Sequence, residues 1–450
     1  MSVAEPWKVV IVGGGFGGLS AAQHLNSNLV DVTVIDRRNY HLFQPLLYQV
    51  ATGSLSPGEV ASPLRSVLSR QKNTREWLGS VTDLDPDSKR VFLADGAIVP
   101  YDSLIIAAGS ETSYFGRNDW QEWARGLKSI EEAATIRHEI LYAFEVAERL
   151  SDPVQRRAWL TFVIVGGGPT GVEMAGAIGE IVRQTLRNDF RSVHPEEAQI
   201  ILLDGAPRVL MPFPEHLAEK VCASLVRLGV QVRPSTMVKH VDKEGLAVEF
   251  DGKTDLIATK TVIWACGVKA SPLGDVLASR TTAETDKGGR VKVRPSLTVP
   301  NYPDIYVVGD LASATDDKGK PLPGLAQVAM QGGRYTAKAI LRKIKRQPEL
   351  PPFRHFGKGS MAVIGRAAAV ANVFGAEISG LLAWMLWAFI HLMYVVQFQS
   401  RLLVFIQWAI QDLTFSRGAR LITGSAATDF DFNREIAQVE RAPEAAAGLR

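Results

Sequence analysis

The sequence predicts an α/β protein with two Rossmann-like dinucleotide-binding domains and a C-terminal helical region that associates with a membrane surface. Two glycine-rich stretches, Val9 to Ala22 and Thr161 to Glu180, each follow a run of β-branched residues and continue into small-residue helical sequence. This order of strand, glycine turn and helix is the signature of dinucleotide binding. The third observation is Leu381 to Val396, an apolar stretch broken only by His391.

The glycines of each stretch have separate predicted roles. In order along the stretch they make a tight turn, let the backbone approach a pyrophosphate, and allow close packing of helix on strand: Gly13 and Gly166, Gly15 and Gly168, and Gly18 and Gly171. The phosphates would lie at the helix N-terminus, where N–H groups and the helix dipole favour negative charge. One fingerprint alone can be a structural turn, but two in the same context predict two nucleotides.

An acid ends the strand that follows each glycine turn. Asp36 follows Gly13 at close to the usual spacing of ~20, where a carboxylate binds ribose hydroxyls, although it could simply end a strand. Asp204 follows its turn at a longer spacing because Glu180 to Pro195 extends the helical connection. A carboxylate there favours NADH over NADPH, whose phosphate it would repel, while nearby Arg208 leaves NADPH open.

The remaining strands indicate a duplicated fold. Leu104 to Gly109 and Thr261 to Gly267 both read as strands ending in glycine, one in each half. Asp304 to Leu311 lies beyond the second half, so we assign it back to the first domain and expect the second domain to be an insertion. Asp310 would then face a helix that starts near residues 324–331, or would be a helix N-cap.

Three segments complete the body. Glu76 to Pro100 alternates like strands around turns at 85–87 and 95–96, which predicts a small antiparallel sheet. Ser129 to Leu150 has helical spacing and begins with a Ser129–Glu132 capping box. Asn39 to Pro57 is apolar without periodicity, so it is either a core-wrapping loop or the lining of a cofactor cleft.

Composition excludes several classes of protein. The 450 residues carry a mild net charge of +3 and no nucleic-acid-binding motif, so we expect no nucleic acid partner. The two cysteines, Cys222 and Cys266, are too few and too far apart for a redox dithiol or a cysteine-ligated cluster, and no metal site is predicted. The N-terminus runs directly into the first strand without room for a signal peptide, so we expect the cytoplasmic side.

The C-terminal region reads as two interfacial helices. As a helix, Leu381 to Val396 is roughly 24 Å long, short of the ~30 Å of a bilayer core, so we expect no spanning helix. Leu402 to Ile410 is apolar again, and Arg417 and Arg420 would bind anionic lipid. The aromatic residues suited to the interface are Trp384, Trp387, Tyr394 and Trp408. The alternative is packing on the body or on a partner subunit.

These motifs resemble the flavoprotein pyridine-nucleotide oxidoreductases and, within them, the single-subunit type II NADH:quinone oxidoreductases. The resemblance rests on NYHLFQPLLYQVATG, GGGPTGVEMAGAI, WACGVKAS, YVVGDLA and AQVAMQ, followed by the aromatic C-terminal helices, and extends to about Ile422. It departs in having AAG at Ala107 to Gly109 where many relatives have ATG, and Cys266 where alanine is usual. It also has alanines at Ala367 to Ala369, where relatives often have basic residues, so we name no proton-delivering lysine.

The resemblance implies the cofactors and their residues. FAD would bind at Gly13, Gly15, Gly18, Asp36, Gly109, Asp310, Ala326 and Gln327, and NADH at Gly166, Gly168, Gly171, Glu173, Asp204 and Gly267. Glu173 would position the nicotinamide or, second, mediate proton traffic, unless it is only a favourable acid in a first helical turn. Gln327 and Gln331 are four apart on one helix face and would bind a quinone carbonyl, unless they are a polar surface pair.

The resemblance also implies domain limits and a mechanism. The expected domains are an FAD-binding domain (1–125 and 295–365), an NADH-binding domain (126–294), a membrane-anchoring and dimerisation region (366–424) and a disordered tail (425–450). NADH would give a hydride to FAD, and two electrons would pass to a membrane quinone without proton pumping. We expect a peripheral homodimer on the cytoplasmic face of the membrane. The alternatives are a flavoenzyme with a soluble acceptor, such as ferredoxin or peroxide, and a slow-turnover flavin redox sensor.

Overall fold

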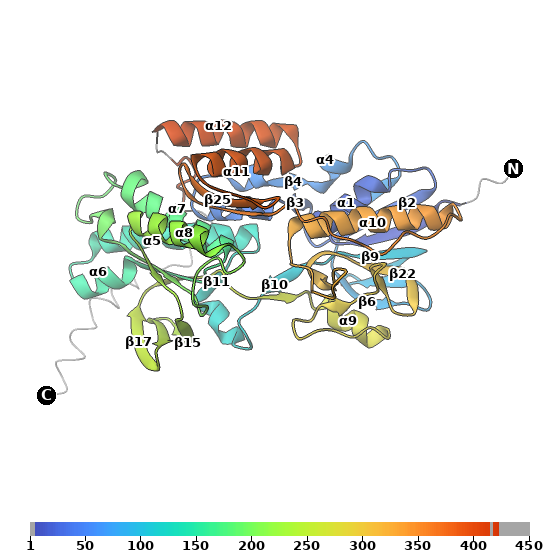
Figure 1. The fold of residues 1–450 in the computed structure, drawn as a ribbon, viewed down its shortest axis with the longest axis horizontal. Helices are drawn as coiled ribbons and strands as arrows, with labels where there is room; N and C mark the ends of the chain where they lie inside the picture. Colours follow the sequence, from blue (N-terminus) through green and yellow to red (C-terminus); the bar gives the residue numbers. More distant parts are fainter. Residues whose placement is uncertain (1–4, 415–416, 423–450) are drawn as a thin grey trace. The chain divides into compact units, whose positions relative to one another are not determined.

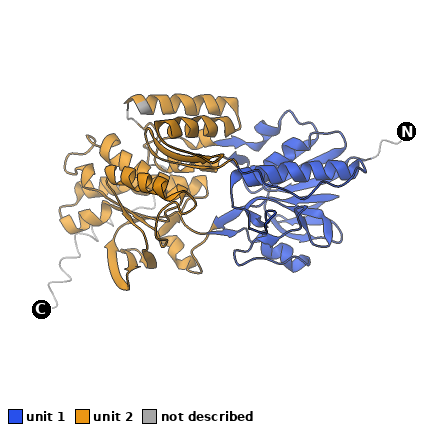
Figure 2. Ribbon diagram, in the orientation of Figure 1, with its two compact units in different colours: residues 1–42, 61–111, 268–357 blue, residues 43–60, 112–267, 358–450 orange. Residues whose placement is uncertain are grey.

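The structure is a computed structural model that describes residues 5–414 and 417–422. Its chain forms two compact units, coloured separately in Figure 2. Unit 1 comprises residues 1–42, 61–111 and 268–357, and unit 2 comprises residues 43–60, 112–267 and 358–450. The predicted disordered tail, 425–450, lies outside the described residues.

Unit 1 is built on a six-stranded sheet in the order β21-β22-β9-β1-β2-β5. All neighbours are parallel except β21 and β22, and the inner strands are almost wholly apolar, as expected for a sheet covered on both faces. Strand β22 pairs with β9, which confirms that the chain returns to the first fold. The strands are β1 (Trp7–Val12), β2 (Val30–Asp36), β5 (Thr74–Leu78), β9 (Ser103–Ile106), β21 (Thr298–Val299) and β22 (Tyr302–Val307).

Helices and small sheets surround this sheet in unit 1. Helices α1 and α10 lie side by side (Figure 1), so closely that a Cβ on Gly333 would lie 2.2 Å from the Gly17 carbonyl oxygen. The predicted small sheet is the antiparallel meander β6-β7-β8, but residues 76–78 of the expected range belong to β5 of the parallel sheet. The remaining elements are α1 (Phe16–His24), β3 (Tyr40–Leu42), β4 (Ala61–Pro63), α4 (Leu64–Leu68), β6 (Val81–Asp85), β7 (Arg90–Leu93), β8 (Ile98–Pro100), β19 (Val268–Ala270), α9 (Leu273–Arg280), β20 (Val291–Lys292), η5 (Gly309–Leu311), β23 (Ala312–Ser313) and α10 (Ala326–Ile344).

Unit 2 repeats the same topology with a five-stranded parallel sheet in the order β11-β18-β12-β13-β14. Strand β12 lies between β13 and β18, just as β1 lies between β2 and β9, so the two sheets confirm the predicted duplication. The strands are β11 (Ala124–Gly126), β12 (Thr161–Val165), β13 (Gln199–Leu203), β14 (Val230–Arg233) and β18 (Thr261–Trp264), and an antiparallel sheet of β15 (Met237–Asp242), β16 (Gly245–Phe250) and β17 (Lys253–Ala258) adjoins them in sequence.

The helices of unit 2 include the predicted capped helix. In α5 (Ile130–Arg149) the Ser129 hydroxyl accepts from the Glu132 N–H and the Glu132 carboxylate accepts from the Ser129 N–H, at 3.2 and 2.9 Å. This is the capping box read from the sequence. The others are α6 (Pro153–Trp159), α7 (Pro169–Glu180), the π-helical turn η3 (Ile181–Thr185) and α8 (Glu215–Arg227), with short 3-10 turns η2 (Asn118–Glu122) and η4 (Pro195–Glu197).

The aperiodic segment Phe43–Val60 belongs to unit 2, although its sequence neighbours belong to unit 1. It forms η1 (Gln44–Leu46), α2 (Leu47–Ala51) and α3 (Pro57–Val60), and α2 packs on α5 and α7. Leu46, Val50 and Leu55 are fully buried. Its lack of period follows from burial on several sides, which leaves no polar face to alternate with an apolar one.

The C-terminal region of unit 2 starts earlier than expected and contains an unpredicted sheet. Strands β24 (Ser360–Gly365), β25 (Ala368–Val373) and β26 (Ala376–Gly380) form an antiparallel sheet that precedes the two expected helices, α11 (Leu381–Tyr394) and α12 (Phe398–Thr414). A Cβ on Gly176 of α7 would lie 1.8 Å from the Ile364 carbonyl oxygen, so β24 belongs with α7. Among the described helices, none combines the length and apolar character needed to cross a bilayer.

The unit limits therefore differ from the expected domain limits. The chain passes from unit 1 to unit 2 at Glu111–Thr112 and returns at Gly267–Val268, rather than at 125/126 and 294/295. The last passage comes at Gly357–Lys358, so residues 358–365, expected in the FAD-binding domain, lie in unit 2. Strand β24 pairs only with β25 in the described chain, and this pairing could not be read from a run of small residues.

Candidate nucleotide and acceptor sites

The glycine turn of unit 1 has the geometry that an anionic ligand needs. Gly13 has φ +104°, and a Cβ on Gly18 would lie 1.8 Å from the Gly13 carbonyl oxygen, so both positions require glycine. A Cβ on Gly15 would meet no atom within 4 Å, and Gly15 caps α1 without a side-chain hydrogen bond. The start of this helix therefore has room for a ligand beside Gly15, which fits the pyrophosphate of a dinucleotide.

Asp36 is fastened to this turn. Its carboxylate accepts hydrogen bonds from the Gly14 N–H at 2.5 Å and from the Arg38 N–H at 2.7 Å. The ring Nδ1 of buried His41 lies 2.9 Å from the Gly14 carbonyl oxygen, and burial lowers the pKa of His41, so the ring is neutral. The carboxylate is thus held at the end of β2, the position from which it would reach a ribose.

Unit 2 repeats this arrangement at its own turn. Gly166 has φ +114°, a Cβ on Gly171 would lie 1.8 Å from the Gly166 carbonyl oxygen, and Gly168 faces open space. Asp204 accepts from the Gly167 N–H and, at 2.6 Å, from the Ala206 N–H. Each contact of Asp204 matches one of Asp36, although the two acids follow their turns at different sequence spacings.

Arg208 has other partners than a 2′-phosphate. Its guanidinium donates to the backbone carbonyl oxygens of Leu210, Met211 and Phe213 at 3.1, 2.9 and 2.9 Å. These bonds hold the side chain against the loop that follows β13. Arg208, which the sequence offered as a partner for a 2′-phosphate, is therefore occupied by backbone carbonyl oxygens.

The other expected FAD residues lie together in unit 1. Gly109 follows β9 with φ +69° and open space around it, and the Ser110 hydroxyl donates to Asp310 at 2.7 Å. Asp310 lies in η5, and a Cβ on Gly324 would lie 3.2 Å from its Oδ1 atom. The N-cap of α10 is Leu325, so Asp310 faces the approach to this helix without capping it.

Gln331 has backbone partners. Its Oε1 accepts from the Phe356 N–H at 2.9 Å and its Nε2 donates to the Phe356 carbonyl oxygen at 3.0 Å. The residue therefore fastens the segment after α10, a role that differs from the expected bond to a quinone. Ala326 and Gln327 form the first turn of the same helix.

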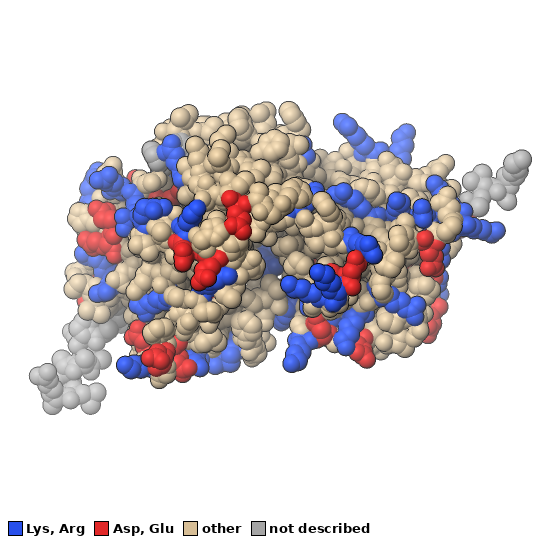
Figure 3. Space-filling model, in the orientation of Figure 1, with Lys and Arg blue, Asp and Glu red and all other residues tan. Residues whose placement is uncertain are grey.

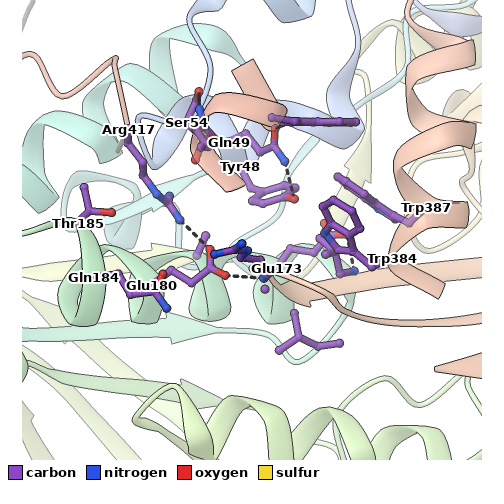
Figure 4. A pocket seen from close by; sticks show the side chains of 17 residues that line it. Tyr48, Gln49, Ser54, Glu173, Glu180, Gln184, Thr185, Trp384, Trp387 and Arg417 are labelled. Carbon is purple, nitrogen blue, oxygen red and sulfur yellow. Dashed lines mark hydrogen bonds and ion pairs between the residues drawn. The ribbon is translucent and has the colours of Figure 1, made fainter. Parts of the chain in front are cut away.

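Unit 2 contains a pocket that the sequence did not reveal (Figure 4). Its cavity volume is ≈90 Å³, and the cavity is continuous with solvent. Three tryptophans line it together with charged and polar groups. The wall includes Tyr48, Gln49, Ser54, Glu173, Ala177, Glu180, Gln184, Thr185, Val363, Ile364, Arg366, Trp384, Trp387, Trp408, Gln411 and Arg417. Gly267, which is expected to bind the nucleotide, has φ +72° and lies beside Phe115. It does not line this pocket.

Glu173 faces this pocket from the second turn of α7. The helix starts at Pro169 and has no acid in its first turn, so the reading of Glu173 as a dipole-favoured first-turn acid is wrong. Burial raises the pKa of Glu173 to about 8, and the Val363 N–H, 3.5 Å from Oε1, opposes this shift only weakly. The carboxyl group is therefore largely protonated at neutral pH and can give up a proton inside the pocket.

Glu180, two turns further along the same face of α7, is ionically paired. Arg417 Nη2 lies 2.9 Å from Glu180 Oε2, and Arg417 Nη1 donates to the Thr52 carbonyl oxygen at 3.1 Å. The Arg366 N–H donates to the other Glu180 oxygen at 2.6 Å. Figure 4 shows Arg417 and Glu180 pointing toward each other across the pocket wall.

The expected lipid contact of Arg417 is wrong because its side chain is buried, and that of the partly exposed Arg420 stays a prediction. Arg417 is 8% exposed and pairs with Glu180, and Arg420 pairs with Asp189 while its Nε donates to the Arg417 carbonyl oxygen at 3.1 Å. Both acids are far from the arginines in sequence, so charge counting near α12 could not find them. The segment after α12 returns to the body of unit 2.

Two family models match the chain. The model for pyridine nucleotide-disulphide oxidoreductases matches residues 7–333, and the model for the NDH2 C-terminal domain matches residues 358–417. The second match starts where the chain enters unit 2 for the last time. Together they cover both dinucleotide folds and the C-terminal sheet and helices.

Relatives and solved structures agree with these matches. The chain is 44% identical over 426 residues to the type II NADH:quinone oxidoreductase Ndh of Mycobacterium tuberculosis, covering 93% of this chain and 91% of the relative. It is also 44% identical to NdhA of that organism, covering 92% and 89%. The fold is similar to that of NDH2 from Plasmodium falciparum in complex with NADH, with TM-score 0.83, 21% identity, and coverage of 93% and 100%. The resemblance drawn from the motifs is confirmed: this chain belongs to the type II NADH:quinone oxidoreductases.

Proposed function

We propose that this chain oxidises NADH and reduces a membrane quinone, without moving protons across the membrane. When bound, FAD supplies the ring that accepts a hydride from NADH and passes two electrons onward. The protein's own contribution is to bind and orient the two nucleotides, to admit the quinone and to supply protons. The observation that supports this most directly is the pocket of unit 2, which combines an aromatic wall with an acid of raised pKa.

The two glycine turns divide the nucleotides between the units. We assign FAD to unit 1, through Gly13, Gly15, Gly18, Asp36, Gly109, Asp310, Ala326 and Gln327, and NADH to unit 2, through Gly166, Gly168, Gly171, Asp204 and Gly267. The open space at Gly15 and Gly168 supports a phosphate at each helix start. The bonds of Arg208 to three carbonyl oxygens support NADH rather than NADPH.

We assign the pocket of unit 2 to the quinone head group. Its tryptophans suit a flat apolar ring, and its polar groups can bond the two carbonyl oxygens of a quinone. Glu173 lines this pocket, which favours the second of its predicted roles, delivery of a proton, over positioning of the nicotinamide. Gln327 and Gln331 belong to unit 1, and a quinone bonded by them, as predicted from the sequence, is the alternative to this assignment.

The pocket wall includes helices whose outer faces suit a lipid surface. The view in Figure 3 is largely without charge over α11 and α12. The exposed apolar side chains of the two helices are Leu381, Leu382, Met385, Phe389, Met393, Phe398, Leu402, Leu403, Phe405, Ile406, Ile410 and Leu413. A contiguous apolar face of this kind supports peripheral binding to a bilayer, from which a long-tailed quinone enters. We place the protein on the cytoplasmic face of the membrane, where NADH is available. We also propose that it is a homodimer, and light scattering in detergent would test this.

A stopped-flow experiment separates this function from its rivals. Anaerobic NADH should bleach the flavin absorbance of the purified holoenzyme, and a quinone in vesicles should restore it within the turnover time. A soluble-acceptor enzyme would be reoxidised by ferredoxin or peroxide and not by quinone. A redox sensor would bleach but turn over slowly with every acceptor. Either result would refute the proposed function.

A further inference from the structure

Three side chains of the pocket form a hydrogen-bond chain with a fixed direction. The Trp408 indole nitrogen lies 2.8 Å from Gln49 Oε1, and Gln49 Nε2 lies 3.0 Å from the Tyr48 hydroxyl oxygen. An indole N–H can only donate, so the Gln49 carbonyl oxygen must face Trp408. The Gln49 NH₂ group then faces Tyr48, and the Tyr48 oxygen must accept. The partners of Gln49 therefore decide which end of its amide is the oxygen and which is the nitrogen.

This direction determines what Tyr48 can do. Its oxygen accepts from Gln49, so its own O–H hydrogen points elsewhere, and the described part of the chain shows no acceptor for it. The residue is buried, at 6% exposure, and lines the pocket. A buried hydroxyl that has accepted one bond can still donate one to an acceptor in the pocket.

We propose that the Tyr48 hydroxyl donates a hydrogen bond to a carbonyl oxygen of the quinone head group, and that Gln49 and Trp408 hold it in this orientation. This inference rests on the proposed function. A donor aimed at a quinone oxygen stabilises the negative charge that develops there as electrons arrive. The step needs no proton from the tyrosine: the quinone takes up two electrons and two protons, and Tyr48 keeps its hydrogen.

The surroundings of Tyr48 favour a hydroxyl that stays protonated. Burial raises the pKa of Tyr48 well above its ordinary value, and Glu173, which is ionised in the pH range where a tyrosine titrates, acts in the same direction. Glu180 acts in the same direction from α7, and Arg417 opposes it. Glu173 is therefore the group that exchanges a proton, and Tyr48 the group that orients and polarises.

The first test measures both half-reactions of the Tyr48→Phe holoenzyme. Flavin reduction by NADH should keep its wild-type rate, and flavin reoxidation by a short-tailed ubiquinone analogue should slow by about 10- to 100-fold, as for loss of one hydrogen bond to a charged group. Unchanged FAD content and melting temperature would show that the variant is folded. Reoxidation at the wild-type rate would overturn the inference and leave the proposed function intact. If the wild-type enzyme itself is not reoxidised by quinone, the proposed function fails instead.

The second test reverses the direction of the hydrogen bond between residue 49 and Tyr48. In Gln49→Glu the new carboxylate accepts from both Trp408 and Tyr48, which draws the Tyr48 hydrogen away from the pocket. When that carboxyl group is protonated it can donate to Tyr48 again, so reoxidation by quinone should fall with rising pH more steeply than in Gln49→Met. The charged groups that face Tyr48, namely Glu173, Glu180 and Arg417, are common to both variants. Identical pH profiles would overturn the positioning role of Gln49.

A pair of tryptophan variants tests the far end of the chain. Trp408→Phe keeps an aromatic ring and removes the N–H that orients Gln49. Trp387→Phe makes the same change on the neighbouring ring, 5.3 Å away between centroids, whose buried N–H has no hydrogen-bond partner within the described residues. The quinone step should lose more kcat in Trp408→Phe than in Trp387→Phe, by about 5-fold or more for an acceptor bond left unmade. Equal losses would attribute the effect to ring packing and overturn the inference.

Discussion

Arg417 and Glu180 form an ion pair in the pocket wall of unit 2, with 2.9 Å between Nη2 and Oε2 and side-chain exposures of 8% and 18%. Burial lowers the pKa of Arg417, but the adjacent Glu180 charge opposes that shift, and the guanidinium also donates to the Thr52 carbonyl oxygen. The pair joins three segments distant in sequence: the end of α7, the aperiodic segment 43–60 and the return after α12. The pair therefore holds the C-terminal region against the rest of unit 2.

Replacing Arg417 should loosen this fastening. Arg417→Gln leaves the Glu180 carboxylate partly buried without its counter-ion, which we expect to cost about 2–4 kcal/mol of unfolding free energy. Thermal unfolding of the FAD-loaded enzyme measures the loss. The matched control is Arg420→Gln, whose pair with Asp189 is more exposed, at 34% and 43%, and should cost at most about 1 kcal/mol. Equal losses would show that the buried pair has no special role.

Glu173 should make stability depend on pH. Its pKa is raised from 4.5 to about 8 in the folded chain, so the folded state holds a proton that the unfolded state has lost between these values. The contribution of Glu173 to the free energy of unfolding is complete below pH 4.5 and declines by about 1.4 kcal/mol per pH unit up to pH 8. Glu173→Gln should remove that decline. Melting curves of both proteins at about pH 5.5 and about pH 7.5 would measure it. Parallel pH dependence of the two proteins would contradict a buried, protonated Glu173.

The parts of the site that could be predicted are those that are local in sequence. Gly13, Gly18 and Asp36 belong to one strand–turn–helix–strand unit, whose geometry is repeated wherever that order of residues occurs. The same holds for the capping box at Ser129, whose two hydrogen bonds join residues three positions apart. Periodicity likewise indicated α11 and α12 and the meander β6-β7-β8.

The pocket could not be predicted, because its members meet only through the tertiary fold. Gln49 and Trp408 form a hydrogen bond although they are 359 positions apart, and Arg417 and Glu180 are 237 positions apart. A charge whose partner is so distant reads as a free charge, which is why Arg417 was expected at lipid. Strand β24 was missed for a related reason, since it is recognised only by its pairing with β25 and its packing on Gly176.

Two glycines of the second turn should respond differently to a methyl group. Gly171→Ala places a Cβ 1.8 Å from the Gly166 carbonyl oxygen, so the turn must distort whether or not NADH is present, at a cost of about 2 kcal/mol or more. Gly168→Ala meets no atom within 4 Å and should leave unfolding unchanged, yet its methyl group occupies the space that we assign to the pyrophosphate. NADH affinity from flavin reduction rates, set beside melting temperatures, distinguishes the two. Normal NADH affinity in Gly168→Ala would place the nucleotide elsewhere.

Asp204 should discriminate between the two nicotinamide nucleotides. Its carboxylate is held by the Gly167 and Ala206 N–H groups, and Arg208 is occupied by three carbonyl oxygens, so a 2′-phosphate would meet negative charge without a compensating cation. Asp204→Asn removes the charge while keeping one acceptor oxygen, and we expect the preference for NADH over NADPH in kcat/KM to fall by about 10-fold, the effect of ~1.4 kcal/mol. Asp36→Asn, the equivalent change in unit 1, should weaken FAD retention and leave this preference unaltered. An unchanged preference in Asp204→Asn would reduce the acid to a structural clamp on the glycine turn.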